Sequence, residues 1–170
     1  MIAIDAEQLQ GWRRMTDEEV PDLSGAIVSD AEKLEKGGIK PTYFVGCDSH
    51  IRKGIITYAK VIAVKMDVED SGVGVICYYK RDRVPRGKTA HRDRLWMEVY
   101  KAVEVAQWLD CLLEPLGHGV EEVHADLNPS AEHLSNCVAS MCLGYIRSMG
   151  FKGAIKPNSW VADAADDKSK

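Results

Sequence analysis

The stretch Tyr43-Phe-Val-Gly-Cys-Asp-Ser-His50 begins with an apolar run that stops at Asp48. Such a run is typical of a strand inside a sheet. A carboxylate at this point costs free energy unless it is paired, hydrogen-bonded or bound to a metal. Asp48 is therefore a candidate functional residue. The alternative is that it caps the turn after the strand, because Asp-Ser is common in turns.

The composition of the 170-residue chain, with 45% hydrophobic and 28% charged residues, is that of a globular protein. We expect a domain over residues 23–170, preceded by an N-terminal appendage at residues 1–22. A net charge of −4 argues against a general polyanion binder but leaves room for a local basic patch. The sequence shows neither a signal peptide nor an apolar run of membrane-spanning length, so the expected location is the cytoplasm, away from membranes.

The five cysteines include no Cys-x-x-Cys pair, which indicates reduced thiols. His133, Cys137 and Cys142 come nearest to a zinc set. Their spacings are not those of structural zinc motifs, so we expect no zinc site there.

Hydrophobic periodicity and turn residues predict alternating strands and helices. The expected elements are a helix at 23–36, strands at 42–48, 55–66 and 73–80, a helix at about 90–113, a strand at 120–126, a helix from Asn128-Pro129 to Gly150, a strand at 151–155 and a last helix from Trp160. Short polar turns make the first three strands an antiparallel meander.

This element order predicts a mixed α/β sheet of five strands, in the order 3-2-1-4-5 and flanked by helices. Strand–helix–strand crossovers normally join parallel neighbours, which favours the fourth strand lying beside the first. Sites form at the carboxyl ends of strands where the strand order reverses. Asp48 and Asp126 are each expected at such an end, so we predict that they are neighbours.

Further acids are placed to join this pair. Glu98 falls at the flank of the apolar stripe of its helix, and Asp163, Asp166 and Asp167 lie on or close to one face of the last helix. Solvated helix edges are the alternative for all of them. Gathered carboxylates repel one another unless a cation intervenes. Oxygen ligands suit Mg²⁺ or Mn²⁺, and two such ions about 4 Å apart support phosphodiester hydrolysis.

The chain resembles the ribonuclease-H-like superfamily and, more narrowly, its YkuK-like bacterial family. The matching sequence segments are Val45-Gly-Cys-Asp-Ser49, Arg94-Leu-Trp-Met-Glu98, His124-Ala-Asp126, Gly150-Phe151, and Lys156-Pro-Asn-Ser-Trp160 followed by Asp167-Lys168. The resemblance covers residues from about 22 to the end.

The resemblance implies a ribonuclease-H-like fold and a nuclease that hydrolyses phosphodiester bonds of nucleic acid. It implies a catalytic and metal-binding set of Asp48, Glu98, Asp126 and Asp167, with two ions of Mg²⁺ or Mn²⁺. The acidic tail leaves the fourth ligand open among Asp163, Asp166 and Asp167, and the spacing from Trp160 favours Asp167. The substrate (RNA, DNA, hybrid or junction) and the oligomeric state stay open. The alternative is an inactive module of the same fold that binds nucleic acid or protein.

The segment from Lys80 to Lys88 is strongly basic. It is a candidate for holding a nucleic-acid backbone near Glu98. Its cationic residues are Lys80, Arg81, Arg83, Arg86 and Lys88. The alternative is a solvated loop. Arg86-Gly-Lys-Thr89 lacks the upstream glycine of a phosphate-binding loop, so we expect no nucleotide site there.

Overall fold

The computed structural model describes residues 4–130 and 136–170. Its elements are α1 (Ala6–Leu9), β1 (Arg13–Arg14), α2 (Leu23–Lys36), β2 (Pro41–Arg52), β3 (Ile55–Val68), β4 (Gly72–Pro85), α3 (His91–Leu113), the 3₁₀ turn η1 (Glu114–Leu116), β5 (Val120–Ala125), α4 (Asn136–Ser148), β6 (Lys152–Ala154) and α5 (Trp160–Ser169). Among these described residues, no helix has the length and apolar character needed to cross a bilayer.

The strands form one six-stranded sheet in the order β1-β4-β3-β2-β5-β6. The hairpins β2–β3 and β3–β4 are antiparallel, whereas β5 is parallel to both β2 and β6. The predicted order of five strands is confirmed. The sheet also contains β1, whose two residues pair with Tyr78 and Tyr79 of β4. A strand this short shows no periodicity, so the sequence did not reveal it.

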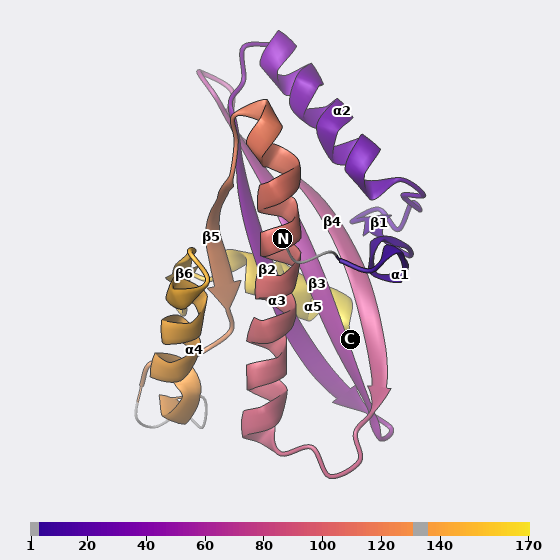
Figure 1. Cartoon of the computed structure of the whole chain (residues 1–170), viewed down its shortest axis with the longest axis vertical. Helices are drawn as coiled ribbons and strands as arrows, with labels where there is room; N and C mark the ends of the chain where they lie inside the picture. The colour runs from indigo at the N-terminus through magenta and orange to yellow at the C-terminus, as the bar shows by residue number, and fades with distance from the viewer. Residues whose placement is uncertain (1–3, 131–135) are drawn as a thin grey trace.

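Helices cover both faces of the sheet, with α3 on one side and α5 on the other (Figure 1). Successive residues of a strand point to opposite faces. Tyr43, Val45 and Cys47 of β2 accordingly join the large core cluster that includes residues of α3. Phe44 joins the smaller cluster that includes Val161 of α5. The apolar run in β2 is continuous because both of its faces are covered.

The residues before α2 pack on the main core. Trp12 is 2% exposed and belongs to the same cluster as α3, while its indole N–H donates to the Gln8 carbonyl at 3.0 Å. The Lys80 ammonium donates to the carbonyls of Glu7 and Gln8 at 2.9 and 3.1 Å. This segment therefore shares the core of the domain, and the expected boundary at residue 22 stays a prediction.

The strand β2 is longer than expected. It continues to Arg52, and Lys53 and Gly54 turn the chain with φ values of 50° and 75°. The expectation that the strand ends at Asp48 is thus wrong. The parallel pairing with β5 stops at Cys47 and Ala125, however, so Asp48 is the first residue of β2 beyond its parallel neighbour. The pairing with β3 carries β2 onward past this point.

Most of the predicted basic loop is strand, because β4 continues to Pro85. Strand alternation places Lys80 and Asp82 on the α3 face, and Arg81 and Arg83 on the α5 face. Asp82 forms ion pairs with Lys60 at 3.0 Å and with Lys101 at 2.7 Å. Lys80 is held by the carbonyls of α1, so the expectation that it contacts nucleic acid is not supported by its position.

The helix expected from Asn128-Pro129 is described only from Asn136 onward, as α4. Residues 128–130 are not helical, and the side-chain oxygen of Asn128 accepts a hydrogen bond from the Ser130 amide at 2.9 Å. Residues 131–135 lie outside the described residues. They include His133 of the rejected zinc set, which the structure therefore does not test.

Gly46 allows α5 to lie directly on the sheet. A Cβ atom there would stand 3.0 Å from the Ala162 amide nitrogen and 3.0 Å from Val161 Cγ1. We expect Gly46→Ala to lower the free energy of unfolding by about 1–3 kcal/mol, because overpacking forces the helix away from the strand. Gly144→Ala in α4 is the matched control, since its Cβ would meet nothing within 4 Å. Urea denaturation of both variants checks this, and equal stability for Gly46→Ala and the wild type would contradict it.

Candidate functional site

Asp48 and Asp126 lie side by side at the end of the parallel strand pair. The last paired residues, Cys47 and Ala125, immediately precede them. Strand alternation points Asp48 to the α5 face, opposite to its neighbour Cys47. The same alternation points Asp126 to that face, because Ala125 belongs to the main core on the α3 side. The predicted meeting of these two acids is consistent with this placement.

Asp48 is buried, with 6% of its surface exposed. Burial raises the pKa of its carboxyl to about 7, and the negative charges of Asp126 and Asp166 raise the pKa as well. The backbone N–H of Ser49 acts in the opposite direction. Asp48 thus bears the cost of a carboxylate taken from water into the neighbourhood of other acids.

Glu98 enters the same cluster from α3. Its side chain is 2% exposed, and its Oε1 accepts hydrogen bonds from Ser49 Oγ at 2.5 Å and from Arg94 Nη1 at 3.2 Å. Burial and the charge of Asp48 hold the pKa of Glu98 well above its ordinary value, and Asp126 adds to the shift. The charges of Asp48 and Asp126 therefore both affect the pKa of Glu98. The sequence pattern predicted only that Glu98 lies at the edge of the apolar stripe of its helix.

On α5 the structure brings Asp166 to the cluster. The Asp166 carboxyl forms a side-chain hydrogen bond with Asp48 that contributes to the raised pKa of Asp48. Asp163 and Asp167 are exposed. The sequence favoured Asp167, but neighbouring helix residues point about 100° apart, and the packing of α5 on Gly46 turns Asp166 toward the sheet. A metal-binding role for any of these acids stays a prediction.

Cations of the chain itself contact three of the four clustered acids. The ammonium of Lys156 lies 2.6 Å from Asp126 Oδ1, a buried oxygen that accepts no well-aligned hydrogen bond. Lys170 pairs with Asp166, and Arg94 pairs with Glu98. Sequence reasoning missed Lys156, Ser49 and Arg94 as site residues. The available signals were the position of Ser49 next to Asp48 and the four-residue spacing between Arg94 and Glu98.

The donor set of the cluster suits a hard divalent cation, because it consists of carboxylate oxygens. The buried, poorly aligned Asp126 Oδ1 is a further feature that a cation would satisfy. Among the described residues, no three His, Cys, Asp or Glu side chains converge closely enough to form a ready metal cage. Carboxylate oxygens are ligands that suit Mg²⁺ or Mn²⁺, and the binding of such an ion at this site stays a prediction.

His124 has a structural role in this arrangement. It is fully buried, its Nδ1 accepts from the Val161 amide at 3.2 Å, and its Nε2 lies 3.0 Å from Glu122 Oε2. Burial lowers its pKa, so the imidazole is neutral and donates through Nε2 to Glu122. Its ring also packs edge-on against Trp160 at 5.6 Å. These contacts join the start of α5 to β5.

Two of the predicted basic residues lie on the same face as Asp48. Asp48 pairs with Ala59 of β3, and Ala59 pairs with Arg81 of β4, so one cross-strand row leads from the acid to Arg81. Arg83 is exposed in the next row. Arg81 is also exposed, and its Nε donates to the Lys168 carbonyl at 2.5 Å. Arg86 and Lys88 are exposed in the connection to α3.

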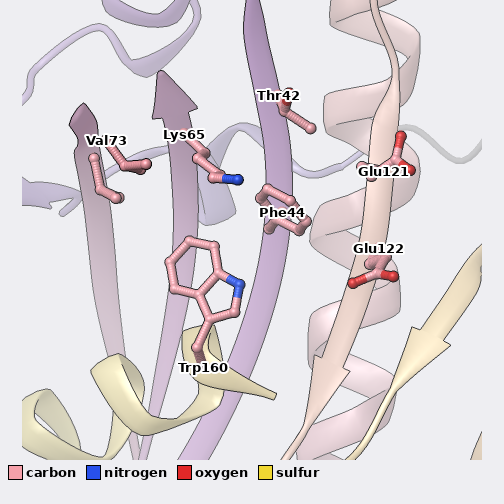
Figure 2. Close-up of a pocket in the computed structure, with 8 residues that line it drawn as sticks. Thr42, Phe44, Lys65, Val73, Glu121, Glu122 and Trp160 are labelled. Atoms are coloured by element: carbon pink, nitrogen blue, oxygen red, sulfur yellow. The ribbon is translucent and has the colours of Figure 1, made fainter. Parts of the chain in front are cut away.

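A separate hollow of about 670 Å³ lies beyond α5 on the same sheet face (Figure 2). Phe44 and Trp160 form its apolar wall, and Lys65 and Glu122 point toward it from β3 and β5. None of the clustered acids lines it. It is therefore distinct from the carboxylate site.

The pKa of Asp48 predicts a pH-dependent stability in the absence of divalent metal. The native state holds a proton on Asp48 up to about pH 7, whereas the unfolded chain loses it near its ordinary value of 3.8. Stability from this group is therefore present at low pH and is lost as the pH rises through about 7. We expect Asp48→Asn, in chelator, to be more stable than the wild type by about 1–3 kcal/mol at about pH 8, with a smaller difference at about pH 5. Denaturant titrations at both pH values check this, and parallel pH profiles would contradict it.

Comparison with known proteins places the chain in a family. No curated protein and no solved structure matches it. The model of one protein family, described as Ribonuclease H-like, matches residues 27–170, and the observed sheet and flanking helices agree with that fold. Membership of the narrower YkuK-like family stays a prediction. Because the matched region spans most of the sequence, the chain belongs to the ribonuclease H-like family.

Proposed function

We propose that this protein hydrolyses phosphodiester bonds of nucleic acid with the help of Mg²⁺ or Mn²⁺. The observation that carries the proposal is the gathering of acids from four elements: Asp48 from β2, Asp126 after β5, Glu98 from α3 and Asp166 from α5. A structural role alone gives no reason to bring mutually repelling carboxylates to one place. Family membership supports a nuclease-like or nucleic-acid-binding activity.

In this proposal the four acids hold the metal. Asp48, Asp126, Glu98 and an acid of α5 would supply the carboxylate oxygens that hold two such ions. When bound, such ions supply an activated water and stabilise the charge on the leaving oxygen. Ser49 and Arg94 hold the Glu98 carboxylate in place, at 2.5 and 3.2 Å. We assign the α5 position to Asp166 instead of Asp167, because Asp166 contacts Asp48 and Asp167 is exposed.

The basic residues on the open sheet face are proposed to hold the nucleic-acid backbone. Arg81 and Arg83 are two residues apart on one strand face, so their Cα atoms are separated by about 6.6 Å along β4. Arg86 and Lys88 extend the positive charge toward α3. Phosphate contacts of this kind position the substrate without reading its sequence. Localisation in the cytoplasm is part of the same proposal.

A second candidate function is a binding module that does not cleave. It is favoured by one observation: Arg94, Lys156 and Lys170 already pair with three of the four acids. A panel of RNA–DNA hybrid, duplex, junction and single-stranded substrates with Mn²⁺ separates the two. Binding without cleavage, together with no calorimetric Mn²⁺ binding, would support the module and reject the nuclease.

The two neighbouring aspartates of α5 test the proposed fourth ligand. We expect Asp166→Asn to lower the rate of Mn²⁺-dependent cleavage by roughly a hundredfold or more, because it removes a carboxylate that contacts Asp48. Asp167→Asn, the matched control, is expected to retain activity within about threefold, because its side chain points to solvent. Initial rates on the best substrate of the panel give the comparison. The reverse order of effects would return the assignment to Asp167.

Arg83 tests the proposed nucleic-acid surface. The test uses the catalytically inactive Asp48→Asn variant, so that the nucleic acid is not cleaved. In this background Arg83→Ala is expected to weaken nucleic-acid binding and to reduce the slope of log K against log salt concentration by about 1, since one phosphate contact is lost. Lys36→Ala makes the same charge change at the exposed end of α2 and is expected to leave both quantities unchanged. Fluorescence anisotropy over a salt series measures them. Equal effects of the two substitutions would indicate general charge attraction and contradict a defined surface.

A further inference from the structure

The Lys156 side chain is placed to interact with the carboxylate cluster. Its ammonium lies 2.6 Å from Asp126 Oδ1, which is buried. Its backbone is fixed close by, because the Lys156 amide donates to the Leu127 carbonyl at 3.1 Å. The lysine therefore neutralises one acid at the point where Asp126 and Asp48 approach each other.

The chain also offers this lysine a second position. A hollow of about 470 Å³ adjoins it, lined by Asn128, Pro129, Lys156, Pro157 and Asp163. The Lys156 side chain is 44% exposed where it pairs with Asp126, so it is only partly enclosed there. Asp163, an exposed acid on the first turn of α5, lies on the wall of the same hollow. The flexible lysine stem can move its ammonium from Asp126 toward Asp163.

We propose that the Lys156 ammonium is an internal cation that occupies Asp126 until a divalent metal displaces it toward Asp163. This inference rests on the proposed metal-dependent function and deepens it, because it names the residue that sets how tightly the site binds metal. A lone ammonium offsets part of the carboxylate repulsion, whereas a divalent ion offsets more of it. The absence of a ready three-acid cage among the described residues fits this arrangement, since Asp126 is engaged by the lysine.

Mn²⁺ binding provides a direct test that does not depend on cleavage. We expect Lys156→Met to bind Mn²⁺ about tenfold more tightly than the wild type or better, because the competing charge is gone. Lys156→Arg keeps the charge and is expected to bind no more tightly than the wild type. Lys152→Met is the matched control: it makes the same charge change on β6, where the ammonium is 75% exposed and 3.5 Å from Glu121. Calorimetry or electron paramagnetic resonance of free Mn²⁺ gives the dissociation constants.

A second measurement uses the unmodified protein and so does not depend on the folding of a variant. Mg²⁺ is expected to raise the rate at which an amine-reactive reagent labels Lys156, as read by mass spectrometry, and to leave Lys152 unchanged. If the wild type binds Mn²⁺ but Lys156→Met binds it equally or more weakly, and labelling does not respond to metal, the lysine inference fails alone. If neither the wild type nor Lys156→Met binds Mn²⁺, the inference and the proposed metal-dependent function fail together.

Discussion

Mutual repulsion between buried carboxylates is the constraint around which the site is organised. Asp48 and Glu98 are both almost fully buried, and the charge of Asp48 helps to raise the pKa of Glu98. Such a pair is unfavourable in a low-dielectric interior unless positive charge or hydrogen bonds accompany it. The chain supplies Arg94, Ser49, Lys156 and Lys170 around the cluster. The chain's own cations and a hydroxyl group therefore offset part of the repulsion within the cluster.

The sheet brings these groups together through one feature of its topology. The parallel pairing of β2 and β5 ends at Cys47 and Ala125, while the β2–β3 hairpin continues. Beyond this point β2 has a neighbouring strand on only one side. Asp48 and Asp126 lie at this point, and the buried Glu98 approaches it from α3. Gly46 lies two residues before it and lets α5 approach closely enough to add Asp166.

The pleat of β4 separates two groups of cations that are adjacent in sequence. Lys80 is on the α3 face, where it holds the carbonyls of α1, and Asp82 on that face is paired with Lys60 and Lys101. Arg81 and Arg83 are on the face that carries Asp48. A single charged segment therefore stabilises the N-terminal packing with one set of residues and places the other set on the sheet face that carries Asp48. Its net charge alone could not distinguish these two roles.

Local patterns in the sequence were sufficient to predict the order of strands and helices, the five-strand arrangement and the meeting of Asp48 with Asp126. Each of these depends on hydrophobic period, turn residues and the handedness of crossovers, which are local or general properties of chains. The tertiary structure alone decided which α5 acid reaches Asp48, which face each basic residue of β4 occupies, and that Lys156 contacts Asp126. A shift of one residue turns a helix side chain by about 100° and moves a strand side chain to the other face, so these outcomes depend on packing and register. The contacts at Gly46 set how α5 packs on the sheet, and the extension of β4 to Pro85 sets which face each of its basic residues occupies.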